Sequence, residues 1–185
     1  MLTHFEGPFS ITPLRTRSWA DVPTSAGAYR WYFPAECLET LKIAAYCDLD
    51  RLNLHQTDDG MVGLYFGIAS NLSQRVKWHS AQALRLSALS SGFLSTYRFS
   101  LLALTETDYF TGGDQINQFM DKLKISWVKT SSKDEAKLIE DAELNSNYHY
   151  PINIQGNHKP EVAQFIQYLK LLRRNYKRRY LEEKT

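Results

Sequence analysis

Continuous hydrophobic runs alternate along the chain with stretches in which apolar residues recur every three or four positions. The continuous runs are rich in aromatic and β-branched residues and predict three strands, at residues 27–33, from residue 63 onward, and at residues 126–130. The three-and-four spacing predicts helices at residues 35–49, 71–89 and 115–123, and another that opens at Ser131 or Ser132 and ends near Asn145. Residues 93–104 fit either a helix or an extended segment.

This order of elements predicts an α/β (α+β) fold with a small, mainly antiparallel three-stranded sheet flanked by helices. The chain has 185 residues, which suits a single domain covering residues 1–185 with a sizeable core. Residues 1–22 are expected to be an extended lead-in packed on the domain. Residues 34–60 are expected to be a helical insertion between the first two strands.

The C-terminal pattern, at residues 160–182, predicts a basic amphipathic helix. Its apolar stripe comprises Val162, Phe165, Ile166, Leu169, Leu172, Tyr176 and Tyr180. Lys170, Arg174, Lys177 and Arg178 lie off that stripe, and Arg173 flanks it. These cations could bind the phosphates of a nucleic acid, although a solvated charged face is the more common role of such a run. The apolar stripe could pack on the domain or pair with a second subunit to form a homodimer.

Composition places the chain among ordinary folded proteins without revealing a partner. Apolar residues make up 43% and charged residues 23% of the sequence. The formal net charge is only +2, so overall basicity does not indicate nucleic-acid binding, and local clusters of charge matter more.

The two cysteines, Cys37 and Cys47, lie ten positions apart on one expected helix, too far apart to form a disulfide. They show no metal-binding spacing, and no signal peptide is recognised, so we expect reduced thiols and a cytoplasmic protein. No apolar run approaches the roughly 20 residues that a membrane-spanning helix needs. We therefore expect no membrane partner.

The most informative chemistry lies between Gly63 and His79. A strand carries Tyr65, and the helix after it carries Arg75 and His79, which are four positions apart and share one face. A guanidinium group binds phosphate oxygens through a planar fork of donors, and a phenol can transfer a proton. Taken singly, Tyr65 is more often a core aromatic and Arg75 a solvated helix charge.

Two short motifs add to this pattern: Gly27-Ala28-Tyr29 in the first strand and Tyr65-Phe66-Gly67 in the second. Together they resemble the paired signature of the GIY-YIG nuclease superfamily, in which the two strands lie side by side. The resemblance implies that Tyr29 and Tyr65 meet at one site. It covers about residues 23–157, which would form the nuclease core, and it extends to Ser95-Thr-Tyr-Arg98 and Asn153-Ile-Gln-Gly-Asn157, which are similar to motifs of uncharacterised bacterial members.

The resemblance implies a divalent-metal-dependent DNA endonuclease. Glu140 takes the family's metal-ligand position, holding one Mg²⁺ or Mn²⁺ ion, and Asn153 takes the closing asparagine position. Arg75 would stabilise negative charge on the phosphoryl group, and Tyr29 or Tyr65 would accept the proton of the attacking water. His79 would touch the phosphate or assist the base.

The same resemblance places Gly67 and Arg98 among the residues that contact DNA. Its central geometric requirement is that both phenols, the guanidinium and the carboxylate face one cavity. A tyrosine ring buried in the interior, or an acid turned toward bulk solvent on the far side, would exclude hydrolysis.

The sequence departs from the family pattern at two places. Ile68 stands where many members carry a lysine, which removes one cation from the neighbourhood of the Tyr65 phenol. The insertion at residues 34–60 replaces a short hairpin and could contact DNA or cover the sheet. These departures keep a second hypothesis open: a catalytically inactive nucleic-acid-binding or protein-interaction module.

Overall fold

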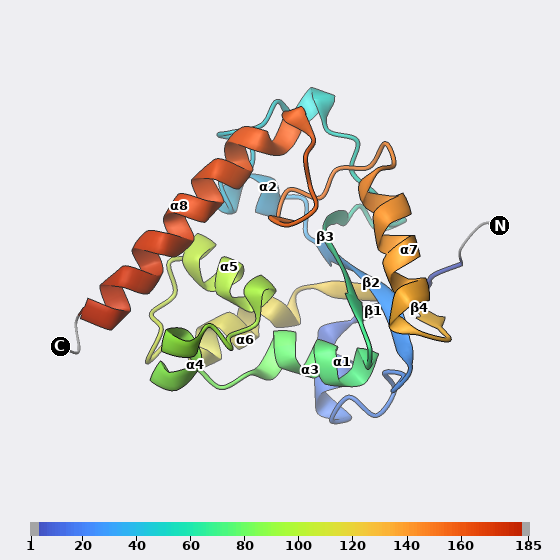
Figure 1. Ribbon diagram of the computed structural model, residues 1–185, viewed down its shortest axis with the longest axis horizontal. Helices are drawn as coiled ribbons and strands as arrows, with labels where there is room; N and C mark the ends of the chain where they lie inside the picture. The colour runs from blue at the N-terminus through green and yellow to red at the C-terminus, as the bar shows by residue number, and fades with distance from the viewer. Residues whose placement is uncertain (1–3, 183–185) are drawn as a thin grey trace.

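The computed structural model describes residues 4–182, and in this part of the chain four strands form one antiparallel sheet (Figure 1). The strands are β1 (Glu6–Ser10), β2 (Ala26–Phe33), β3 (Val62–Ala69) and β4 (Lys124–Thr130). Their order is β1-β4-β2-β3, so β3 lies at one edge of the sheet. The α/β architecture with helices around an antiparallel sheet is confirmed, but the expected number of three strands is wrong.

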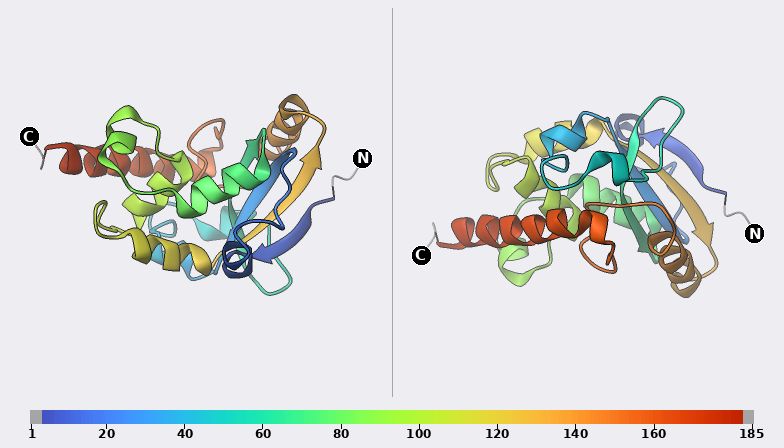
Figure 2. Two further views of the ribbon diagram at one scale, coloured as in Figure 1. Left: turned by 90° about the horizontal axis from the view of Figure 1, so that it is seen from below. Right: turned by 90° about the horizontal axis from the view of Figure 1, so that it is seen from above.

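The additional strand, β1, lies inside the segment that was expected to be an extended lead-in. It pairs with β4 on the edge opposite β3, with a register shift between Glu6 and Phe9 (Figure 2). The Phe9 ring stacks on Trp127 at 4.4 Å between centroids. A Gly-Pro pair in sequence usually marks a break, but a proline without an N–H group is tolerated on an edge strand. The short helix α1 (Ile11–Thr16) follows directly.

Helices cover both faces of the sheet (Figure 1). One face carries α3 (Leu72–Ala81), α5 (Thr96–Leu104), α6 (Gly113–Asp121) and α8 (Pro160–Glu182), and the other carries α7 (Lys133–Leu144). Residues 93–104, whose sequence fits either a helix or an extended segment, contain helix α5. The expected helix at residues 71–89 is in fact two, α3 and α4 (Leu86–Ser91). The first ends at Ala81, where the guanidinium groups of Arg15 and Arg98 bind the Ser80 carbonyl.

The insertion between β2 and β3 is mostly irregular, so the expected helix at residues 35–49 is wrong. Only α2 (Cys37–Thr40) and the 3₁₀ turn η1 (Leu49–Arg51) are helical. Lys42 has a positive φ of 61°, which ends helical geometry directly after α2. Leu41 and Ile43 are buried in the main core, so the insertion covers the core. Cys37 and Cys47 are buried free thiols, and burial raises the pKa of Cys47 to about 11.

The C-terminal helix α8 uses its apolar stripe within the chain. Val162, Phe165 and Leu169 are buried in the main core, and Tyr176 packs edge-on against Phe99 of α5 at 5.7 Å. The homodimer expected through this stripe is therefore not supported, because the stripe is already covered. No helix in residues 4–182 is long and apolar enough to cross a membrane.

The first glycine motif generates a stability prediction. A Cβ atom on Gly27 would lie 2.2 Å from the Val128 carbonyl oxygen and 2.7 Å from a Leu72 methyl group. We expect Gly27→Ala to lower the free energy of unfolding by about 1–3 kcal/mol through overpacking, measured by urea denaturation. The matched control is Gly113→Ala, where the added carbon has no described heavy atom within 4 Å beyond its chain neighbours and the backbone of its own helix. Equal stability of the two variants would contradict the close packing of β2 against β4.

Candidate active site

A cavity of about 270 Å³ lies at the free edge of β3. Its walls include all six residues that the sequence analysis singled out for chemistry: Tyr29, Tyr65, Arg75, His79, Glu140 and Asn153. Gly67 and Ile68 also line it. Residues separated by more than a hundred positions in the chain are thus brought to one place.

Two faces of the sheet contribute to this cavity because β3 has a neighbouring strand on one side only. Tyr29 pairs with Gly67 across β2 and β3, and Trp31 pairs with Tyr65, so both phenols lie on the face covered by α3. Glu140 comes from α7, which packs on the opposite face. The cavity therefore curves around the edge of the sheet.

The glycine of the second motif makes room for the first tyrosine. A Cβ atom on Gly67 would lie 2.6 Å from the Tyr29 hydroxyl oxygen, so any larger residue would displace that phenol. Tyr29 is only 2% exposed, yet it forms part of the cavity wall together with Tyr65, so both phenols face one cavity as expected. Tyr65 is partly exposed, and its ring packs on Tyr97 of α5 at 4.5 Å.

A chain of short contacts leads from Tyr29 into the protein. The Tyr29 hydroxyl lies 2.7 Å from His79 Nε2, and His79 Nδ1 lies 2.5 Å from Ser95 Oγ. Ser95 caps α5 by accepting a hydrogen bond from the Arg98 N–H group. Burial, Arg75 and Arg98 hold the pKa of His79 well below its usual range, so its ring is neutral near pH 7. One ring nitrogen is therefore a donor and the other an acceptor.

The two phenols share a polar but poorly hydrated environment. Burial raises the pKa of Tyr29 well above its usual value and that of Tyr65 to about 12. The positive charges of Arg75 and Arg173 act in the opposite direction on the pKa of Tyr65. Arg173 belongs to α8, and sequence reasoning did not assign it to the site. Its guanidinium lies 5.0 Å from the centre of the Phe99 ring, and its Nε has no hydrogen-bond partner among the described residues.

Glu140 is the one acidic side chain among the described residues that line the cavity. Its side chain is 18% exposed and forms an ion pair with Lys137 at 3.3 Å. No group of three or more His, Cys, Asp or Glu side chains suited to a metal ion occurs in residues 4–182. A single carboxylate still fits Mg²⁺ or Mn²⁺, because a hard cation of this kind keeps several water ligands.

Asn153 closes the open edge of β3. Its side-chain oxygen accepts a hydrogen bond from the Phe66 N–H group at 2.8 Å, and its side-chain nitrogen donates to the Phe66 carbonyl at 2.8 Å. The N–H group of Ile152 donates to the Leu64 carbonyl at 3.1 Å. The amide of Asn153 thus satisfies strand backbone and positions the loop at the cavity.

The comparison with protein families agrees with this geometry. The model of the GIY-YIG catalytic domain matches residues 27–175, well over half of the chain. The chain belongs to the GIY-YIG catalytic domain family. No curated protein and no solved structure matches it. Membership indicates a nuclease-type, hydrolytic activity.

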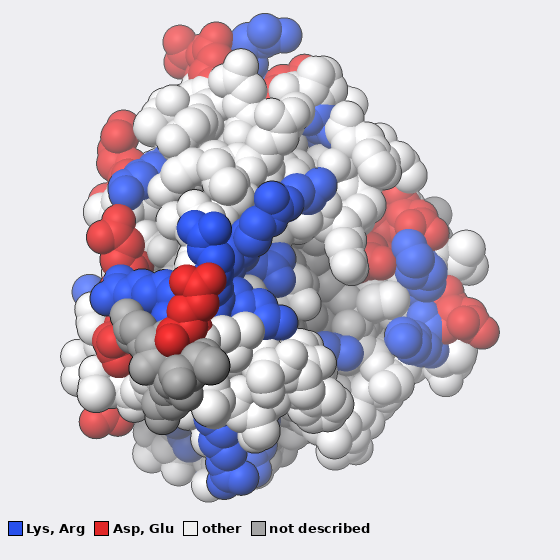
Figure 3. Space-filling model, turned by 60° about the vertical axis from the view of Figure 1, so that its left-hand side comes forward, with Lys and Arg blue, Asp and Glu red and all other residues white. Residues whose placement is uncertain are grey.

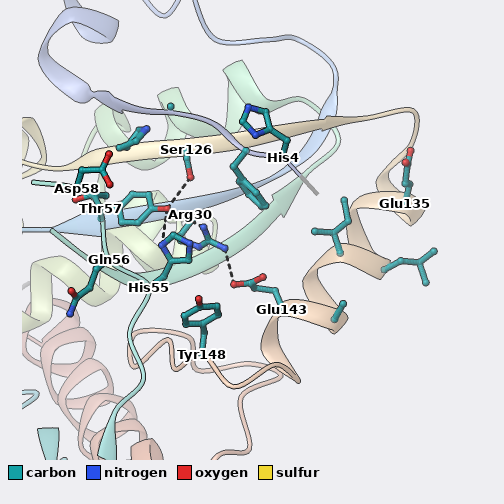
Figure 4. Close-up of a pocket in the computed structure, with 17 residues that line it drawn as sticks. His4, Arg30, His55, Gln56, Thr57, Asp58, Ser126, Glu135, Glu143 and Tyr148 are labelled. Carbon is teal, nitrogen blue, oxygen red and sulfur yellow. Dashed lines mark hydrogen bonds and ion pairs between the residues drawn. The ribbon is translucent and has the colours of Figure 1, made fainter. Parts of the chain in front are cut away.

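In this GIY-YIG domain, a buried polar network holds α7 against the sheet on the side away from Tyr29. Arg30 is 4% exposed, and its guanidinium donates to Glu143 at 2.8 Å and to the Tyr150 hydroxyl at 2.8 Å. Burial alone would lower the pKa of Arg30, but Tyr150, Tyr32 and Glu143 raise it. Figure 4 shows Arg30 and Glu143 meeting in a second cavity of about 850 Å³. Because Glu143 lies nearly one turn after Glu140, this ion pair fixes the helix that carries the candidate metal ligand.

The residues predicted to contact DNA lie in three different environments in this GIY-YIG domain. Arg98 is 1% exposed and donates to the Ser80 carbonyl and to Asn117, so its guanidinium lies inside the protein and not on the surface where DNA was expected to contact it. Gly67 lies at the cavity, where it gives space to Tyr29. The cations of α8 face outward: Lys170, Arg174 and Arg178 are exposed and Lys177 is half-buried. Figure 3 shows basic side chains gathered on this side of the molecule, next to a recess in the surface.

The buried histidine predicts a pH dependence of stability. The pKa of His79 is lowered in the folded state, whereas the unfolded chain protonates near pH 6.5. Its contribution is therefore present above pH 6.5 and is lost as the pH falls, by about 1.4 kcal/mol per pH unit. We expect His79→Gln to remove this slope in urea denaturation series between about pH 7.5 and 5.5. Burial also lowers the pKa of His55, so His55 adds its own pH dependence of stability. That contribution is the same in the wild type and in His79→Gln. Identical slopes would contradict a neutral, buried His79.

Proposed function

We propose that the protein is a divalent-metal-dependent DNA endonuclease that hydrolyses phosphodiester bonds. The observation that supports this most strongly is the meeting of two phenols, a guanidinium and a carboxylate in one cavity at the β3 edge. Family membership supports the nuclease class, and the finer assignment rests on the chemistry of these side chains.

Each side chain has a role that follows from its surroundings. Arg75 lies close enough to influence the pKa of both phenols, and there it stabilises the negative charge that develops on the attacked phosphate. Burial keeps both phenols protonated, so Tyr29 or Tyr65 accepts the proton of the attacking water only while giving up its own hydroxyl proton. For Tyr29 the acceptor of that hydroxyl proton is neutral His79, whose Nε2 lies 2.7 Å away, and the same hydrogen bond orients the phenol. Asn153 is a positioning residue, since both ends of its amide bind the backbone of Phe66.

Glu140 supplies the carboxylate for one Mg²⁺ or Mn²⁺ ion. Such an ion, when bound, polarises the phosphate and stabilises the leaving oxygen. The Lys137 ammonium forms an ion pair with the Glu140 carboxylate at 3.3 Å. A bound metal ion would have to replace this ammonium group.

The C-terminal helix α8 supplies the positive charge that attracts the DNA substrate. The exposed cations of α8 would bind phosphates along a strand, while the net charge of the whole chain is close to neutral. Arg173 on the same helix lies near enough to offset part of the rise that burial causes in the pKa of Tyr65. It compensates for Ile68, which stands where many family members carry a lysine.

Removing the candidate metal ligand tests the proposal directly. We expect the wild type to nick or cut plasmid DNA in Mg²⁺ or Mn²⁺ and to be inactive in a chelator. Glu140→Gln should lower the rate at least about 10³-fold, the scale on which a metal ion contributes to charge stabilisation. The control is Asp141→Asn, the next residue on α7, whose side chain is 54% exposed. Full activity of Glu140→Gln would overturn the mechanism.

The phenols generate a second prediction. We expect Tyr29→Phe and Tyr65→Phe each to reduce cleavage by about 10²–10⁴-fold, the usual contribution of a general base or its partner. Both variants should keep the unfolding midpoint of the wild type within a few degrees. Tyr46→Phe, which removes a hydroxyl from a surface tyrosine outside the cavity, should leave the rate unchanged. If either cavity variant cleaves at the wild-type rate, that phenol has no part in proton transfer.

The replacement of the usual lysine by Ile68 favours one alternative, an inactive binding module on the same scaffold. That alternative predicts salt-sensitive DNA binding without cleavage in any divalent metal. Metal-dependent cleavage that Glu140→Gln abolishes would exclude it.

A further inference from the structure

A further cleft, of about 510 Å³ and separate from the cavity at Arg30, shares a wall with the candidate active site. Arg75 and Trp78 line both hollows, so the two are contiguous. None of the described residues that line this cleft is acidic. Its volume lies within the range of small-molecule and cofactor sites.

An exposed aromatic ring stands at the mouth of the cleft. Phe93 is 71% exposed, and its ring centroid lies 5.5 Å from that of Trp78. The surrounding backbone is anchored, because Gln82 donates from its side-chain nitrogen to the Phe93 carbonyl and accepts from the Ser95 N–H group. Phe93 thus leaves a large apolar surface in water beside the Trp78 ring, and a flat group that stacks there would bury this surface.

Positive charge surrounds the two aromatic rings. The Arg75 guanidinium lies 4.8 Å from the centre of the Trp78 ring. Lys77 is exposed and has no carboxylate partner among the described residues. Aromatic faces beside unpaired cations suit a nucleotide, because the base stacks on a ring while the cation binds its phosphate.

We propose that the Trp78–Phe93 cleft binds an unstacked nucleobase of the substrate strand, directly beside the bond that is cut. The substrate is then DNA with unpaired nucleotides at the cleavage position, such as a gap, a flap or a single strand. The position of the scissile phosphate in this statement rests on the proposed function. A protein side chain is the weaker candidate, because it would not require the cations or the shared wall with the phosphate site.

The test is a comparison of two labelled oligonucleotides of equal length and charge, one of thymidine and one with abasic sites throughout. Binding is measured by fluorescence anisotropy without divalent metal. We expect the wild type to bind the thymidine strand about tenfold more tightly, the scale of a single base–aromatic stack. Phe93→Ala should bind both strands equally, and Phe93→Trp should restore the preference. Lys77→Ala should weaken both strands alike and leave the ratio unchanged.

Equal binding of the two strands by the wild type, or an unchanged preference in Phe93→Ala, would overturn the base-binding cleft. If the cleft binds a protein side chain instead of a base, the two strands also bind equally, and the proposal fails in the same way. A cleavage assay in Mg²⁺ or Mn²⁺ on a plasmid that carries a single-stranded gap separates this outcome from failure of the proposed function. Cleavage without a base preference removes the cleft alone, whereas a base preference without cleavage removes the hydrolytic assignment and retains the cleft. Phe93 is largely exposed, so its variants should unfold at the wild-type midpoint.

Discussion

The pair of hydrogen bonds between the Asn153 amide and the Phe66 backbone is the interaction on which the arrangement of this site depends. It satisfies both backbone groups of an edge-strand residue that has no further strand beside it. A fifth strand at this position would satisfy the same groups and block the passage between the two faces. With a side chain in its place, the edge stays narrow, and Glu140 on one face can share a cavity with Tyr65 on the other.

Burial sets the electrostatics of the cavity. It raises the pKa values of both phenols and lowers that of His79, so the resting site contains neutral proton donors and acceptors. Fixed positive charge then comes from Arg75 on α3 and Arg173 on α8. A poorly hydrated site of this kind strengthens the attraction for a phosphate and disfavours a free phenolate. The structural ion pair of Arg30 with Glu143 lies on the other side of the sheet, where it secures α7.

Much of the site could be predicted from the sequence because its motifs are local. Tyr29, Tyr65 and Gly67 lie in strands whose hydrophobic runs are unambiguous, and Arg75 and His79 are related by one helical turn. Their meeting followed from the family resemblance. That Tyr29 is buried beneath Gly67 and bonded to His79 could not be predicted, because it depends on tertiary packing of β2 against α3.

Other features escaped prediction for physical reasons. Strand β1 contains a Gly-Pro pair, which local propensity treats as a break, while its pairing with β4 spans more than a hundred residues. The apolar residues of the insertion at residues 34–60 have helical spacing, but a left-handed Lys42 interrupts the helix. Ser95 and Arg98 are polar residues that were matched to motifs, yet they face the end of α3, where they bind His79 and the Ser80 carbonyl. Burial of this kind depends on the fold and cannot be read from residue type.

The proposed mechanism requires a DNA phosphate to enter the cavity at the β3 edge, between the phenols and the carboxylate. A crystal structure of the Glu140→Gln variant, with cleavage blocked, bound to DNA that carries an unpaired segment would show whether it does. We expect a backbone phosphate within hydrogen-bond distance of Tyr65 and Arg75, with the substituted side chain of α7 on its other side. DNA bound on another face, with no phosphate between these side chains, would be incompatible with the mechanism.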